Sequence, residues 1–130
     1  MIFDLPKVDP LQLPISSLAY IGDGVMNLHF RLRFLNLYKP SEIEKVVRRF
    51  VSKEGQARAL DALWKKLSDD ERNVAKRGMN SRSATRHGND PLYRKSTGLE
   101  ALIGYLYVTG RERRLREIFD EIVRIQGQTR

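Results

Sequence analysis

The sequence predicts an all-α fold, a single domain of about six helices. The main evidence is that apolar residues recur every three or four positions, as they do on the buried face of a helix. That spacing covers most of the chain, and no stretch alternates apolar and polar residues as a strand would. Helix-capping signatures precede several of the apolar runs. The 130 residues, 41% of them hydrophobic, are enough for one domain with a modest core. We therefore expect residues 1–130 to form one domain without an internal repeat.

The first helices follow from prolines, serines and apolar spacing. Three prolines predict an extended or turn-like segment over residues 1–14, and the first long helix is expected from about residue 16 to residue 37. The apolar stripe of that helix consists of Leu18, Ile21, Val25, Leu28, Leu32 and Leu35. Ser41 with Glu44 has the spacing of a capping box and predicts the start of a second helix. Ser52 is predicted to cap a third.

The second half of the chain contains three further predicted helices and one irregular segment. Another capping box, Ser68 with Glu71, opens the fourth helix. Residues 79–95 break all periodicity and predict a long exposed loop, a feature that is usually functional or disordered. The fifth and sixth helices are expected over residues 97–109 and 111–125.

Composition restricts the classes of function. A net charge of +8 and a pI near 10.0 favour a polyanionic partner, nucleic acid above all, although a basic surface that only aids solubility is the simpler alternative. The absence of cysteine excludes disulfides, thiolate catalysis and sulfur-based zinc sites. The two histidines, His29 and His87, are too few for most imidazole metal cages. No signal peptide or membrane span is evident, which predicts a cytoplasmic protein with no membrane partner.

Two predicted core helices each carry one isolated carboxylate. Asp23 is the only fully charged side chain of residues 10–30, and Glu100 is the only one of residues 98–108. A lone carboxylate in apolar surroundings is costly unless it has a cation as partner. These two side chains are therefore the candidates for chemistry.

Glycines flank both acids. Asp23 lies between Gly22 and Gly24, and Gly104 follows Glu100 by one helical turn. Glycine inside a helix costs roughly 1 kcal/mol relative to alanine. We expect these glycines to let something approach the helix backbone closely.

The two acids suit a metal ion if their helices pack together. Two hard oxygen ligands, with water and phosphate completing the shell, favour Mg²⁺ or Mn²⁺, and such an ion can activate water for phosphoryl displacement. Alternatively, each acid pairs with one of the many arginines elsewhere in the chain. Paired carboxylates also serve glycoside hydrolysis, but the positive charge argues against a neutral sugar.

Basic side chains gather in and around the predicted loop. Between Lys76 and Lys95 there are six lysines or arginines and one acid, Asp90. Such a loop can contact phosphates or enter a groove of duplex RNA, whereas the simpler interpretation is a solvated loop. A further basic run lies on the second and third helices, and part of it is expected to be an ordinary solvated face. The candidate RNA contacts from both regions are Lys53, Arg77, Arg82, Arg86, Arg94 and Lys95.

Two motifs carry a family resemblance. Leu18-Ala-Tyr-Ile-Gly-Asp-Gly-Val resembles the signature helix of the ribonuclease III catalytic domain, and Ser96-Thr-Gly-Leu-Glu-Ala-Leu-Ile-Gly-Tyr-Leu-Tyr resembles its second active-site helix. The small size, the missing double-stranded-RNA-binding domain and the lead-in Tyr93-Arg-Lys-Ser-Thr are similar to the Mini-ribonuclease III branch. The resemblance covers about residues 10–125.

This resemblance implies a homodimeric, all-helical endoribonuclease that cuts double-stranded RNA with Mg²⁺, or with Mn²⁺ as a substitute. By the same resemblance Asp23 and Glu100 are catalytic and bind the metal, and Tyr20 lies at the dimer interface. Larger relatives carry two further acids at the positions of Ala19 and Thr97. These two replacements leave fewer protein ligands for each metal ion.

The resemblance also implies a biological role, the maturation of the precursor of large-subunit ribosomal RNA. Two other functions fit the same basic helical chain. One is a protein that binds structured RNA without cutting it, for which the loss of two family acids is an argument. The other is a ribosome assembly factor in which both carboxylates pair with arginines.

Overall fold

The computed structural model describes residues 4–86 and 88–128, and every regular element in these residues is a helix. This confirms the predicted all-α class. The α-helices are α1 (Ile15–Arg33), α2 (Pro40–Val51), α3 (Lys53–Leu63), α4 (Asp69–Met79), α5 (Arg82–Thr85), α6 (Pro91–Val108) and α7 (Glu112–Gln128). Short 3₁₀ turns occupy η1 (Pro10–Gln12), η2 (Leu35–Leu37) and η3 (Trp64–Lys66).

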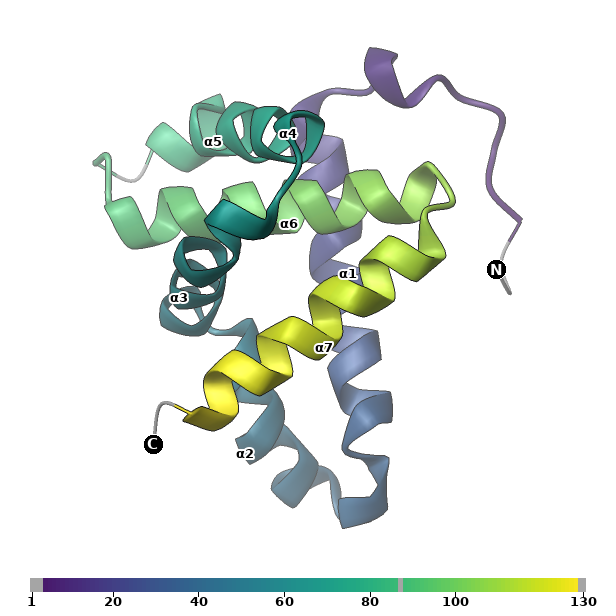
Figure 1. Cartoon of the computed structure of the whole chain (residues 1–130), viewed down its shortest axis with the longest axis vertical. Coiled ribbons are helices and arrows are strands. Elements are labelled where there is room, and N and C mark those ends of the chain that lie inside the picture. The colour runs from purple at the N-terminus through teal and green to yellow at the C-terminus, as the bar shows by residue number, and fades with distance from the viewer. Residues whose placement is uncertain (1–3, 87, 129–130) are drawn as a thin grey trace.

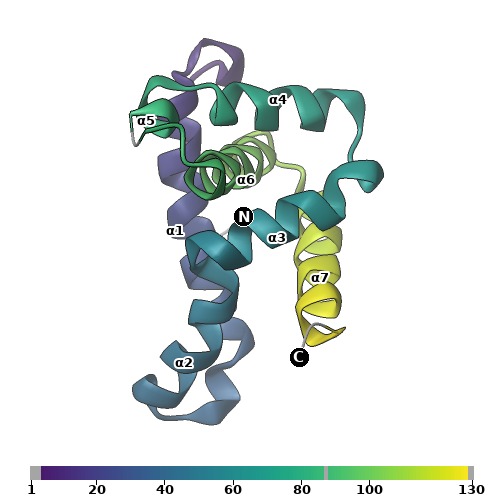
Figure 2. The same cartoon turned by 90° about the vertical axis from the view of Figure 1, so that its left-hand side faces the viewer.

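Helix α6 is the centre of the fold. In Figure 1 it crosses the middle of the molecule, and in Figure 2 it is seen nearly end-on with α1, α3, α4 and α7 around it. Its residues from Ser96 to Leu106 are buried on every side, with Glu100 the one partial exception. A helix that is apolar around its whole circumference has to be enclosed in this way.

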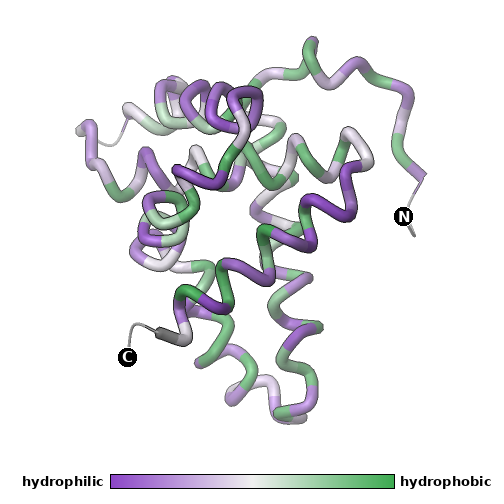
Figure 3. Tube along the Cα trace, in the orientation of Figure 1, coloured by the Kyte–Doolittle hydropathy of each residue, from purple (hydrophilic) through white to green (hydrophobic). Residues whose placement is uncertain are grey.

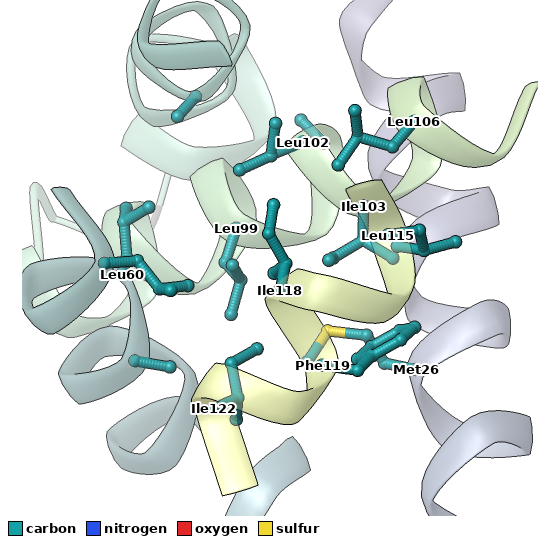
Figure 4. Packing of buried hydrophobic residues seen from close by; sticks show 14 of the residues in the cluster. Met26, Leu60, Leu99, Leu102, Ile103, Leu106, Leu115, Ile118, Phe119 and Ile122 are labelled. Carbon is teal, nitrogen blue, oxygen red and sulfur yellow. The ribbon is translucent and has the colours of Figure 1, made fainter. Parts of the chain in front are cut away.

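Helix α7 closes the core from the C-terminal end of the chain. Its residues alternate between hydrophilic and hydrophobic along the tube in Figure 3, as expected for an amphipathic helix. The hydrophobic side places Ile118 and Ile122 against Leu99 of α6 and Leu60 of α3 (Figure 4). Each of these four side chains is at most 1% exposed, and burial of such a side chain contributes about 1.5–3 kcal/mol.

Two of the three predicted helix caps are present. The hydroxyl of Ser52 accepts a hydrogen bond from the Gly55 amide at 3.1 Å, and Ser68 and Glu71 form a complete capping box. Burial opposes ionisation of Glu71, but hydrogen bonds from Arg114 and Ser68 outweigh it and lower the pKa of this carboxyl. The predicted box at Ser41 and Glu44 is wrong, because α2 already begins at Pro40, whose fixed φ suits a first helical position.

The long stripe predicted on the first helix does not face the core. Only Leu18 of that stripe is buried, whereas Leu28 and Leu32 are 48% and 58% exposed. The buried face of α1 consists of Leu18, Ala19, Gly22, Met26 and Phe30. Helix α1 therefore has two apolar faces, and the buried one packs on α6 because Ala19 and Gly22 permit a close approach. The helix also ends earlier than expected, at Arg33.

The segment predicted as a long loop is largely ordered into helices. Helix α4 continues to Met79, α5 follows, and α6 begins at Pro91, six residues before the expected start at Thr97. The Ser81 hydroxyl caps α5, and the Asp90 carboxylate accepts from the Leu92 amide at 3.0 Å to cap α6. Short polar residues of this kind are typical of loops, but Asp followed by Pro is also a strong helix start.

The remaining expectations concern the chain before α1 and the membrane. From Asp4 the backbone is irregular apart from η1, which Asp9 caps, so the prediction of an extended or turn-like segment is confirmed for residues 4–14. None of the described helices combines the length and the apolarity that a membrane span requires. His87 lies outside the described residues.

Candidate active site

The site forms where α1 crosses α6 with almost no side chain between them. A Cβ atom on Gly22 would lie 1.8 Å from the carbonyl oxygen of Glu100, and one on Gly104 would lie 1.9 Å from the carbonyl oxygen of Leu18. No side chain fits at such distances, so glycine is required at both positions. The predicted close approach to the helix backbone is confirmed for Gly22 and Gly104.

Gly24 behaves differently from its neighbour. A Cβ atom added at Gly24 would have no heavy atom within 4 Å, so packing inside the described chain does not require glycine there. The expectation of a close approach at this position is wrong for the isolated chain. The reason is helical geometry, because residues two apart lie on nearly opposite faces of α1.

The crossing brings the two lone carboxylates together. Asp23 follows Gly22 directly, and the Glu100 carbonyl is the atom that Gly22 approaches, so both acids lie at the point of contact. Their carboxyl groups are within hydrogen-bonding distance of each other. Burial raises the pKa of Glu100 to about 8, and the hydrogen bond and negative charge of Asp23 add to it, whereas a hydrogen bond from Gln56 acts in the opposite direction.

Within the described residues, no ion pair neutralises these two acids. None of the ion pairs among residues 4–86 and 88–128 involves Asp23 or Glu100. The arrangement in which each acid is matched by an arginine is therefore absent from this part of the chain. With its pKa raised in this way the Glu100 carboxyl holds a proton at neutral pH, and a divalent ion would replace that proton.

The residues present fit a hard divalent ion only as part of its coordination shell. No group of three or more potential metal-binding carboxylates or imidazoles occurs among the described residues. Ala19 has no donor atom, and the hydroxyl of Thr97 donates to the Tyr93 carbonyl at 3.0 Å, away from the acids. Two carboxylates leave most of the shell to water and phosphate oxygens, which suits Mg²⁺.

An apolar groove of about 710 Å³ runs beside Asp23, between α1 and α7. Asp23 and Gly24 lie on its wall, together with the exposed leucines of α1. Tyr20, 80% exposed, lines the same groove. Other apolar lining residues are Ile21, Val25, Leu28, Leu32, Leu115 and Phe119.

His29 packs as part of this helix pair. Its ring stacks on Phe119 with 3.9 Å between ring centroids and an angle of 8° between the planes. Burial, and next the nearby charge of Arg33, lower the pKa of His29 to about 4, so the imidazole is neutral at physiological pH.

Comparison with known proteins is consistent with this geometry. Residues 16–111 match the model of the ribonuclease III domain family. The chain is 40% identical over 115 residues to Mini-ribonuclease 3 of Kosmotoga olearia, covering 87% of this chain and 79% of that protein. It is 35% identical over 118 residues to Mini-ribonuclease 3 of Staphylococcus aureus, covering 86% and 88% of the two chains.

The chain belongs to the ribonuclease III family, in its Mini-ribonuclease 3 branch. Membership makes it an endoribonuclease, as the resemblance of the two motifs implied. A crystal structure of a Fusobacterium nucleatum protein shares the fold, with a TM-score of 0.77 at 24% identity over 87% of this chain and 93% of that one.

The six candidate RNA contacts of this ribonuclease III domain differ in how they are held. Arg77, Arg82 and Arg86 are exposed on α4, on α5 and just after α5. Lys53 is also exposed, and its ammonium group lies 4.8 Å from the centre of the Tyr93 ring. These four side chains extend into solvent from the described surface.

The other two candidates are engaged within the fold. Arg94 donates to the Met79 carbonyl at 2.8 Å and to the Asn80 amide oxygen at 2.6 Å, which ties the start of α6 to the end of α4. Lys95 forms an ion pair with Asp61 at 3.0 Å. A role of these two side chains in RNA binding remains a prediction.

Three polar residues near the acids were not identified from the sequence. Asn27 donates to the Asp23 carbonyl at 2.8 Å, Gln56 hydrogen-bonds Glu100, and Ser96 donates to Gln56. A signal existed for Gln56, since it occupies the apolar face of α3 at helical spacing from Ala59 and Leu60. A polar residue at a core position needs a partner.

The crossing predicts opposite effects for two neighbouring glycines. Gly22→Ala is expected to lower the unfolding free energy by about 1–3 kcal/mol, because its methyl group would displace the α6 backbone. Gly24→Ala, the matched control, is expected to raise it by about 0.5–1 kcal/mol, because alanine is the better helix former and meets no atom. Urea unfolding at one protein concentration measures both, and equal effects at the two positions would contradict the crossing geometry.

Proposed function

We propose that this endoribonuclease hydrolyses phosphodiester bonds of double-stranded RNA with Mg²⁺ bound at Asp23 and Glu100. The observation that carries the proposal is the carboxyl pair, which is close enough for a hydrogen bond and lacks a cationic partner in the described chain. Bringing two negative charges together in a partly buried place costs free energy, and a divalent ion offsets that cost. The same ion supplies the charge needed at a scissile phosphate.

The two carboxylates have different surroundings and so different tasks. Asp23 is exposed, and its oxygens are accessible to a phosphate and to water. Glu100 is half-buried on the central helix, so its position relative to the core is fixed. It would therefore hold the ion at a fixed place beside α6. When bound, Mg²⁺ lowers the pKa of a water molecule and neutralises charge on the phosphate. The role of the two acids is to hold the reacting groups in position, and Glu100 releases its proton when the ion binds.

The basic side chains of α4 and α5 are proposed to hold the RNA. Arg77, Arg82 and Arg86 are exposed on α4, on α5 and just after α5, and α5 lies beside the start of α6 (Figure 1). Arginine suits this task because its planar group binds phosphate oxygens in pairs. Lys53, Arg94 and Lys95 lie near them on α3 and α6 and add positive charge to the same region.

A homodimer is proposed to cover the groove between α1 and α7. The exposed Tyr20, Leu28 and Leu32 form a contiguous apolar surface with the groove, larger than isolated surface leucines would explain. A two-fold axis through this face would bring the α1 helices of two chains together, with one carboxyl pair for each RNA strand. We further propose that this dimer acts in the cytoplasm, in maturation of the large-subunit ribosomal RNA precursor.

The first test removes one charge from the pair. Asp23→Asn is expected to slow cleavage of a long RNA duplex in Mg²⁺ by about 100-fold or more, because the ion loses a charged ligand. Duplex binding measured in Ca²⁺ is expected to stay near that of the parent protein. The matched control is Asp69→Asn, which changes a side chain that is 98% exposed at the start of α4 and should cleave normally. Retained cleavage by the Asp23 variant would remove this residue from the mechanism.

The second test concerns the arginines around α5. Replacing Arg82 and Arg86 together by glutamine is expected to weaken duplex binding and to reduce its salt slope by about one for each phosphate that the variant no longer neutralises. Lys45 and Arg48 serve as the control pair, since they lie on α2 at the other end of the molecule (Figure 1). Unchanged affinity with an altered cleavage pattern would make Arg82 and Arg86 readers of sequence instead of clamps.

The third test concerns assembly. Leu28→Lys is expected to halve the mass measured by light scattering, because a charge in an apolar interface costs several kcal/mol when desolvated. Leu11→Lys is the control, since Leu11 is 75% exposed but does not line the groove. A parent protein that is already monomeric, or a Leu28 variant of unchanged mass, would disprove the proposed interface.

A further inference from the structure

A buried amide, the side chain of Gln56, lies next to the Glu100 carboxyl. Gln56 on α3 is 1% exposed and lies on a helix face whose other members, Ala59, Leu60 and Leu63, are fully apolar. Burying an amide of this size costs about 1–3 kcal/mol unless its hydrogen bonds are made. A side chain kept here must therefore use its polar atoms on specific partners.

Each end of the amide has a partner on a different side of the site. The Ser96 hydroxyl donates to Oε1 of Gln56, and the amide nitrogen donates to the Glu100 carboxylate. Nε2 also lies 3.5 Å from Sδ of Met26, on the buried face of α1. The amide thus contacts α1 and α6 at their crossing, while it belongs to a third helix.

Ser96 determines which way the amide points. It precedes Glu100 by one turn of α6, so the two side chains lie on the same face of that helix. With Oε1 occupied by the hydroxyl, the NH₂ group is left to face Glu100. A series of hydrogen bonds therefore runs from Ser96 through Gln56 to Glu100, and it supplies the carboxylate with a donor from α3.

A neutral donor differs from a cation at this place. A lysine or arginine would neutralise the carboxyl pair and compete with a metal ion, whereas an amide binds one oxygen and leaves the negative charge in place. The Glu100 carboxyl interacts with Gln56 and with Asp23, so the amide restricts its movement without cancelling its charge. Partners of this kind typically account for about 10- to 100-fold in metal affinity.

We infer that Gln56 is a positioning residue, which holds the Glu100 carboxylate in its ion-binding orientation through the hydrogen-bonded chain that starts at Ser96. This inference rests on the proposed function, because it assumes that Asp23 and Glu100 bind a divalent ion. Since Gln56 is only 1% exposed, its role is to act through Glu100 and not by touching RNA or the ion.

The experiment measures binding of Mn²⁺ alone, without RNA, by electron paramagnetic resonance or calorimetry on the full chain. Gln56→Met keeps the length of the side chain and removes the donor, and is expected to weaken Mn²⁺ binding by about 10- to 100-fold. Thr97→Val is the matched control, because it removes a neighbouring buried hydroxyl that bonds the Tyr93 carbonyl instead of the amide. This control should bind Mn²⁺ as the parent protein does.

Further readouts separate positioning from a loss of folding. The folded Gln56→Met protein should need a higher Mg²⁺ concentration for half-maximal cleavage, with the KM for duplex RNA unchanged. Should that variant fail to fold, Ser96→Ala is the second test. This substitution removes the hydroxyl that orients the Gln56 amide, so Mn²⁺ binding is expected to weaken several-fold. Parent-like Mn²⁺ affinity in a folded Gln56→Met protein, or in Ser96→Ala, would overturn the inference.

The same measurements distinguish this inference from the proposed function. If the parent protein binds Mn²⁺ and cuts a duplex while the variants bind equally well, only the role of Gln56 is wrong. If the parent protein binds no Mn²⁺ and cuts nothing, both the metal site and the role of Gln56 are wrong.

Discussion

The contact between the backbones of α1 and α6 determines where everything else lies. Gly22 and Gly104 each occupy a place where a methyl group would overlap a carbonyl oxygen of the opposite helix. Each glycine lowers helix stability by roughly 1 kcal/mol, and the fold offsets this through tight burial of α6 on all sides. Because Asp23 and Glu100 are next to this contact in the chain, the packing that fixes the core also fixes the distance between the two acids.

Burial of this carboxyl pair disfavours the ionised form that metal binding needs. Burial of Glu100 beside Asp23 raises the pKa of its carboxyl to about 8, so without a cation the pair favours a bound proton. The donors around it are neutral amides and hydroxyls, which preserve the negative charge when the proton leaves. A stable core would more simply place an arginine there, as it does where Arg114 meets the buried Glu71 at 2.8 Å. The contrast between these two buried acids supports a functional interpretation of the first.

Local signals predicted the helices well, and tertiary choices were harder to predict. Ser52 and the Ser68 capping box act within one turn of chain, so their effect is visible in the sequence. The outer leucines of α1 satisfy the same periodicity as a core stripe, and spacing alone does not say which of two apolar faces will be covered.

Side chains that cross between helices are also invisible to pattern reasoning. Arg94 is expected from the sequence to be an exposed charge, but its partners at Met79 and Asn80 are brought to it by the turn after α4. Gln56 is a polar residue on an apolar face, but its hydrogen bonds run to α6, 40 residues away in the case of Ser96. Asp23 and Glu100 could be selected as candidates from the sequence because each is the only charged residue in a long apolar segment.

The engagement of Arg94 and Lys95 has a consequence for the kinetics of encounter with a polyanion. Both still contribute to the net charge of +8, which acts over about a Debye length of 8–10 Å and steers diffusing partners whatever the local hydrogen bonds. Close contact is different, since a guanidinium whose donors are already bound to Met79 and Asn80 has fewer left for a phosphate. Attraction from a distance is therefore a property of the whole charge distribution, whereas residence time depends on the subset of side chains that the helices leave extended into solvent.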